Sequence, residues 1–212
     1  MAAWTLHDTQ GEVKSVSVVG DDVYLLINRN GTYVIEQFDD DLNLDSALTG
    51  EVGTPTQNWS GLDHLDGQSV SVVADGVAQN DQIVSGGTIV LDNPASHIEV
   101  GLPYTHIIEP LPPTASGEGG FGYRLRLVEA IFRLQKTQSL SLDTGRGLKD
   151  IPLREIGQTP ILNAPPPAVS GDIPVRALGW QKSGEDALWR IEQSLPYPFT
   201  LLSVTAEIKI ND

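Results

Sequence analysis

The sequence contains no cysteine, one methionine and few aromatic residues, which make up 6% of its 212 positions. The absence of cysteine excludes disulfide bonds, thiolate catalysis and zinc sites built on cysteine. Basic side chains are also scarce: 13 Lys and Arg, scattered along the chain, stand against 28 Asp and Glu and give a formal net charge of -15. Because such a chain repels phosphates, we expect it to bind neither nucleic acid nor anionic membranes directly.

Long hydrophobic runs are missing as well. The longest, Val23 to Ile27, is far too short to cross a bilayer, and the N-terminus lacks the basic and apolar stretches of a signal peptide. We therefore expect no membrane span and no export signal. The length is nevertheless sufficient for one large domain or two small ones with a substantial core.

Strand-like patterning covers nearly the whole chain, so we expect an all-β fold. Val13 to Val19 and Val23 to Asn28 are aliphatic runs separated by a turn cluster, which predicts a hairpin. Asn30-Gly31 follows, and this dipeptide readily adopts the positive φ angles of a type I′ turn. With an outer segment near Trp4 to His7, these strands predict a four-stranded antiparallel meander, the size of one propeller blade.

The central part predicts a smaller inserted module. Its strand-like segments alternate with Asp75-Gly76 and Gly86-Gly87, two dipeptides typical of tight turns, and this close spacing indicates a small β-barrel or sandwich. The expected strands are Gln68 to Ala74, Val77 to Val84, Thr88 to Leu91 and His97 to Tyr104.

The last third predicts a C-terminal β-sheet. Tyr123 to Leu142 fits neither the strand nor the helix period perfectly. A helix over about Leu127 to Lys136 is one interpretation, but we favour a long strand broken near Glu129, because the extended pattern continues beyond it. Further strands are expected at Val175 to Trp180, Leu188 to Ser194 and Leu201 to Ile210.

These patterns divide the chain into three regions. Residues 1–57 are expected to form the meander, which packs with the C-terminal sheet, residues 58–112 the inserted module, and residues 113–212 the C-terminal β domain. A Pro- and Gly-rich loop, Pro110 to Gly122, marks the second boundary.

One segment is a candidate metal site. Asp39, Asp41, Asn43 and Asp45 recur at every second residue, as the oxygen ligands of a Ca²⁺ loop do. The segment differs from an EF-hand loop, because Leu44 stands where that loop turns on glycine and the final glutamate is missing. A solvated strand edge or turn is the alternative interpretation.

No pattern indicates an enzyme, and we expect neither catalytic residues nor a cofactor other than Ca²⁺. The four histidines are far apart, with no H-x-H or H-x-x-x-H pair, and no G-x-S-x-G elbow is present. Asp63 and Asp66 could act as a glycosidase pair, but we interpret them as loop caps. We therefore expect a binding or assembly module.

Four segments of the chain carry a resemblance to a known family. They are similar to tail nozzle or tubular tail protein B-like proteins of short-tailed bacteriophages and prophages, most specifically in the motifs GLDHLDG and VGLPYT. The resemblance extends over most of the chain from about Val16. The segments are LDSALTG (Leu44 to Gly50), WSGLDHLDGQSVSVVADG (Trp59 to Gly76), IVLDNPASHIEVGLPYT (Ile89 to Thr105) and PYPFTLLSVTAEIKI (Pro196 to Ile210).

The resemblance implies a structural component of the virion tail. It implies a homo-oligomeric ring, commonly a hexamer, below an adaptor ring and surrounded by tail fibres or spikes, with DNA passing through its lumen during ejection. Family members are longer and carry β-blades before this region, so the meander would correspond to a last blade of a fragment or short relative. An acidic wall suits such a conduit, because it does not hold transiting DNA.

The motif residues themselves have an architectural interpretation. Their glycines allow tight turns, their leucines pin a loop to the core, and their aspartates cap it, while the second motif anchors the end of a strand. These residues are Gly61, Leu62, Asp63, Leu65, Gly67, Gly101, Leu102, Pro103 and Tyr104.

Two alternatives remain beside the structural role. The first is a carbohydrate- or receptor-binding β module of a phage tail, in which tryptophans line a sugar groove instead of packing in a core. The second is a tail-associated glycan hydrolase that uses paired carboxylates. The tryptophans in question are Trp4, Trp59, Trp180 and Trp189.

Overall fold

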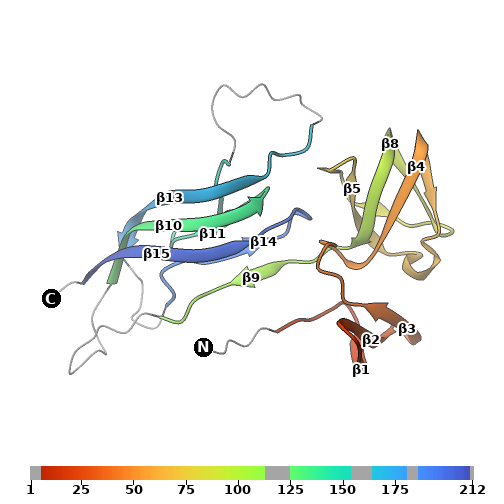
Figure 1. Ribbon diagram of the computed structural model, residues 1–212, viewed down its shortest axis with the longest axis horizontal. Helices are drawn as coiled ribbons and strands as arrows, with labels where there is room; N and C mark the ends of the chain where they lie inside the picture. Colours follow the sequence, from red (N-terminus) through yellow and green to blue (C-terminus); the bar gives the residue numbers. More distant parts are fainter. Residues whose placement is uncertain (1–5, 113–124, 154–163, 181–185, 211–212) are drawn as a thin grey trace. The chain divides into compact units, whose positions relative to one another are not determined.

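The computed structural model describes residues 6–112, 125–153, 164–180 and 186–210. The predicted all-β fold is confirmed, with every strand pairing antiparallel. The one helical segment in these ranges is a 3-10 turn, η1 (Asp63–Leu65), and no helix there is long and apolar enough to cross a membrane. The chain divides into two compact units, Met1–Tyr104 and Thr105–Asp212, coloured red to yellow-green and green to blue in Figure 1.

Unit 1 begins with a three-stranded meander of β1 (Glu12–Val19), β2 (Asp22–Arg29) and β3 (Thr32–Gln37). Both predicted hairpins are confirmed, and the second turns on Asn30 and Gly31 at φ 52° and 92°. The two residues lie in the left-handed region, which Asn and Gly tolerate best.

The fourth strand predicted for the meander is not seen in the described residues. Leu6 and His7 lie outside any strand, and residues 1–5 fall outside the described part of the chain. The meander also has little core of its own, because every residue of β1 is exposed and Ile27 is its one buried side chain.

The rest of unit 1 is a five-stranded sheet in the order β4-β8-β5-β6, with β7 pairing to β5. Three features of it differ from the prediction. The segments expected at 88–91 and 97–104 are one long strand, the strand expected at 77–84 is two short strands, and the boundary expected at residues 57–58 falls within β4. The strands are β4 (Asp45–Ser60), β5 (Ser69–Ala74), β6 (Val77–Ala78), β7 (Gln82–Ile83) and β8 (Thr88–Leu102).

Irregular pairing explains why the continuity of β4 and β8 was not predicted. The β4–β8 register shifts between Glu51 and Thr56 and again before Asn58, so the ladder accommodates Gly53 and Pro55 as bulges. β4 and β8 are paired both before and after the irregular stretch. A proline or glycine therefore bends the strand at this point without ending it.

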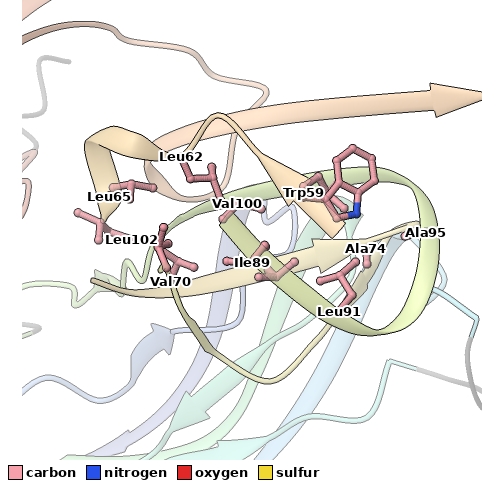
Figure 2. Close-up of a cluster of buried hydrophobic side chains, with 13 residues drawn as sticks. Trp59, Leu62, Leu65, Val70, Ala74, Ile89, Leu91, Ala95, Val100 and Leu102 are labelled. Atoms are coloured by element: carbon pink, nitrogen blue, oxygen red, sulfur yellow. The ribbon is translucent and has the colours of Figure 1, made fainter. Parts of the chain in front are cut away.

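One core holds this sheet together. Alternate residues Val70, Val72 and Ala74 of β5 lie on the same face of the sheet as residues of β8, because Val72 pairs with Val100 and Ala74 with Ile98. In Figure 2, β8 bends around the cluster that these side chains form. The buried residues are Trp59, Leu62, Leu65, Val70, Val72, Ala74, Val84, Ile89, Leu91, Ala95, Ile98, Val100 and Leu102.

Unit 2 consists of two antiparallel sheets that share one core. The first has the order β13-β10-β15, visible in Figure 1, and the second β12-β11-β14-β9. The core takes side chains from both, including Phe132 of β10 and Ile191 of β14. The strands are β9 (His106–Ile108), β10 (Leu125–Thr137), β11 (Ser141–Asp143), β12 (Lys149–Asp150), β13 (Val169–Trp180), β14 (Arg190–Gln193) and β15 (Leu201–Ile210).

The break predicted in the first long strand of this unit is confirmed. Odd-numbered residues of β10 are buried up to Leu127, and even-numbered ones from Ala130 to Leu134. The pairing with β15 shifts between Leu127 and Glu129 because β10 has one extra residue there. The pairing with β13 shifts at the same place, but there β13 has the extra residue. Because the buried positions change from odd-numbered to even-numbered residues, the sequence fitted neither the strand period nor the helix period.

The observed units differ from the three predicted regions. β4 runs through the first predicted boundary, at residues 57–58, and β9 belongs to unit 2 through its pairing of His106 with Gln193. That the meander packs with the C-terminal sheet stays a prediction. The Gly-rich stretch 113–124 lies outside the described residues.

Candidate functional site

The two family-like motifs meet on the core of the β4–β8 sheet. GLDHLDG follows β4 and leads into β5, while VGLPYT ends β8. Leu62, Leu65 and Leu102 of these motifs are no more than 3% exposed and belong to one hydrophobic cluster (Figure 2). The motif leucines therefore hold this module together.

Backbone geometry fixes the first motif. Gly61 and Gly67 have φ of +93° and +77°, a region that favours glycine. The amide of Leu62 donates to the carbonyl of Gly87 at 3.0 Å, and the Gly87 amide donates to Asp66 Oδ1 at 3.2 Å. The motif thus closes one end of the module by reciprocal hydrogen bonds.

Close approach of two backbones explains the glycine of the second motif. A Cβ on Gly101 would lie 2.8 Å from the carbonyl oxygen of Asp45 and 2.8 Å from Leu44 Cβ. After it, the carbonyl of Pro103 accepts a hydrogen bond from Gln10 Nε2 at 3.0 Å. The second motif therefore joins β8 both to the start of β4 and to the N-terminal segment, and the half-buried Tyr104 ends unit 1.

The members of the aspartate-rich segment have separate protein partners. Asp39 Oδ1 accepts from the amide of Asp41 at 2.9 Å, and the amide of Asn43 donates to Glu99 Oε1 at 2.7 Å. The carboxylate of Asp45 binds an arginine, described next. Within the described residues no three His, Asp or Glu side chains form a group that could hold a metal ion. Calcium binding here stays a prediction.

A charged cluster that the sequence did not predict joins the meander to β4. The guanidinium of Arg29 makes two 2.8 Å hydrogen bonds to Glu36 and two to Asp45, at 2.9 and 3.3 Å. It also donates to Thr9 Oγ1 and to the carbonyl of Gln10. We call these five residues the Arg29 cluster.

Burial and pairing act in opposite directions on the Arg29 cluster. The side chains of Arg29, Glu36 and Asp45 are 9%, 19% and 13% exposed. Burial disfavours the charged guanidinium, but hydrogen bonds to the two carboxylates outweigh it and raise the Arg29 pKa above its ordinary value. The sequence held one signal for this cluster, because Arg29 is one of two basic residues in unit 1.

Glu99 is a second buried charge that the sequence did not single out. Its residue is 8% exposed, and burial raises the pKa of its carboxyl group. The amide of Asn43 and the nearby His97 oppose that rise. The carboxylate thereby fixes the chain just before β4.

The charge of the protein is divided unequally between the two units. Unit 1 has 16 acidic and 2 basic residues, whereas unit 2 has 12 acidic and 11 basic residues. The formal net charges are thus -14 and -1, so nearly all of the total of -15 belongs to unit 1. A body with this net charge repels polyanions at long range.

The described tryptophan side chains contribute to cores. Trp59 is 8% exposed in the core of unit 1, and its indole nitrogen donates to the carbonyl of Thr56 at 3.2 Å. The ring of Trp189 meets Phe132 edge to face, with centroids 5.4 Å apart. The side chains of Trp4 and Trp180 lie outside the described set. Packing is therefore the observed use of Trp59 and Trp189.

Comparison with known proteins gives no identification. No protein-family model matches the chain, and no curated protein matches it.

Proposed function

We propose that this chain is a structural component of the tail of a short-tailed bacteriophage, a nozzle or tail-tube subunit that forms a ring through which DNA passes. The sequence resemblance suggests the role. In this proposal the subunits form a ring of about six copies, as the resembling family implies, with adaptor and fibre or spike proteins as neighbours. The chain performs no chemistry on the DNA and resides in the virion tail.

The observation that carries the proposal is the use made of the family-like residues. Leu62, Leu65 and Leu102 pack in one core. Gly61 allows a backbone turn, and Gly101 allows the backbones of β8 and β4 to approach closely. Side chains buried in this way determine shape and do not face a substrate. Motif residues of this kind suit an assembly part better than an enzyme.

The charge of unit 1 supports the conduit. Protein surfaces that hold DNA do so with clustered Lys and Arg, which displace counterions from the phosphates. Unit 1 offers two such residues against 16 carboxylates. A duplex passing this surface is repelled and does not stick, which is the behaviour that a conduit needs.

Light scattering of the chain over a concentration series, with negative-stain images of the same sample, tests the proposal. We expect rings of about six subunits and no shift of duplex DNA mobility, even at low salt. A strictly monomeric chain at high concentration would contradict the ring. Release of reducing sugar from host surface polysaccharide, lost on carboxylate substitution, would replace the proposal with a hydrolase.

A further inference from the structure

The hairpin of β11 and β12 presents two exposed cations beside an apolar side chain. Arg146 and Lys149 are exposed, and Leu148 is 47% exposed. Within the described residues, neither cation has a carboxylate within 4 Å, whereas Arg133 of the same unit is paired with Asp172. We call Arg146, Leu148 and Lys149 the hairpin tip.

The hairpin tip is held in shape by its own turn. Asp143 Oδ1 accepts hydrogen bonds from the amides of Gly145, Arg146 and Gly147 at 2.7, 3.0 and 3.0 Å. The two glycines have φ of +91° and +88°. A turn fixed in this way loses little conformational freedom when a partner binds, so more of the contact energy appears as affinity.

The chemistry of the hairpin tip fits an anionic protein surface. Arginine is enriched where interfaces concentrate their binding energy, and an exposed leucine between two cations adds apolar contact that a phosphate backbone would not use. Unit 1 of this same chain carries a formal charge of -14 and is therefore the complementary surface that the molecule itself provides.

We propose that the hairpin tip of one copy docks on unit 1 of a second copy. The inference rests on the proposed function, because it assigns a contact of the proposed ring. The contact joins two different surfaces, and a head-to-tail contact of this kind generates a ring when its rotation closes. Since its main attraction is between exposed charges, it weakens as salt is added.

Charge reversal tests the contribution of the hairpin tip. The test variant carries Arg146→Glu and Lys149→Glu. The control variant carries Lys136→Glu and Lys209→Glu, which reverse two exposed lysines elsewhere in unit 2 and change the net charge by the same amount. By light scattering of the full chain, we expect the first pair to weaken self-association about tenfold and the control pair much less. Equal effects of the two pairs, or none from the tip pair, would overturn the proposal.

Zero-length carbodiimide cross-linking of a mixture of ¹⁴N- and ¹⁵N-labelled chains tests the partner. We expect Lys149 to be linked to Asp or Glu of unit 1 in mixed-isotope products. Links confined to unit 2, or to a single chain, would overturn the inference. So would a DNA mobility shift that the tip variant abolishes, because the tip would then bind nucleic acid.

The two proposals fail in different ways. If the unmodified chain forms rings that the tip variants leave intact, the contact is wrong and the ring stands. If the unmodified chain is a monomer at every concentration, the proposed ring and the contact are both wrong.

Discussion

Two three-stranded antiparallel sheets of this protein are stabilised by different means. In β10, the central strand of the β13-β10-β15 sheet, six of thirteen residues are buried, whereas β2, the central strand of the meander, buries Ile27 alone. The first sheet packs on a hydrophobic core within its own unit. The meander leaves Val18 63% and Ile35 76% exposed and is joined to β4 through the Arg29 cluster.

The difference teaches that strand patterning and sheet stability are separate properties. Both sheets have the alternation and the turns of β-structure, so both are readable in the sequence. Burial of apolar area stabilises one, at roughly 25 cal/mol per Å². In the other, a polar cluster fixes the position of the sheet while adding little apolar burial. The following substitutions test this contrast, from the largest expected effect to the smallest.

Truncation of the central side chain of unit 2 should be the most costly change. Phe132 is fully buried and packs edge to face on Trp189, so Phe132→Ala should lower the free energy of unfolding by about 3–5 kcal/mol. Ile35→Ala in the meander should change it by less than about 0.5 kcal/mol, because that side chain is exposed. Chemical denaturation followed by circular dichroism measures both, and similar losses would refute the contrast.

Removal of the buried cation should loosen the meander. Arg29→Met leaves Glu36 and Asp45 partly buried without their partner, and we expect a loss of about 2–3 kcal/mol. Hydrogen exchange of the β1–β3 amides should accelerate accordingly.

The matched control is Arg133→Met, which breaks an exposed bidentate pair with Asp172 in unit 2. Exposed pairs contribute roughly 0–1 kcal/mol, so its loss should be small. If the two substitutions cost the same, burial does not distinguish these pairs.

An added methyl group at the close approach of β8 to β4 should strain the module. Gly101→Ala would place Cβ 2.8 Å from the carbonyl oxygen of Asp45, and we expect a loss of about 2 kcal/mol. Gly53→Ala, where nothing lies within 4 Å, should be nearly neutral. Thermal unfolding compares the two, and an unchanged Tm for Gly101→Ala would show that the backbones separate easily.

The smallest effect should be a pH dependence from Glu99. Its raised pKa means that the folded chain binds this proton more readily than the unfolded chain. The group therefore adds stability as pH falls through the raised pKa toward the ordinary value of 4.5, and none further below it. Relative to Glu99→Gln, the unmodified chain should gain stability over this window. Denaturation midpoints at several pH values measure the difference, and parallel profiles would contradict it.

Local signals predicted most of the fold. The Asn30-Gly31 turn, the hairpins and the break near Glu129 follow from dihedral preference and side-chain alternation within short windows. The continuity of β4 and β8 was missed. In β4, Gly53 and Pro55 are residues typical of turns, and only the long-range pairing with β8 accommodates them within a strand.

The candidate site was less predictable for the same reason. The motif leucines follow from an apolar pattern, but the partners of Arg29 and Glu99 do not, because each is fixed by the folded chain. Arg29 meets Asp45 across 16 residues, and Glu99 meets the amide of Asn43 across 56. Sequence spacing alone gives no measure of such distances.

The bulge in β10 has a consequence for how the sheet is aligned. Because both neighbours shift their pairing at the same place, between Leu127 and Glu129, the irregularity runs across all three strands. A slide of β10 by one residue would move its extra residue away from the matching position in β15, would move its shift away from the extra residue of β13, and would turn Phe132 toward solvent. The irregularity therefore fixes the register of the three strands and opposes slippage during folding.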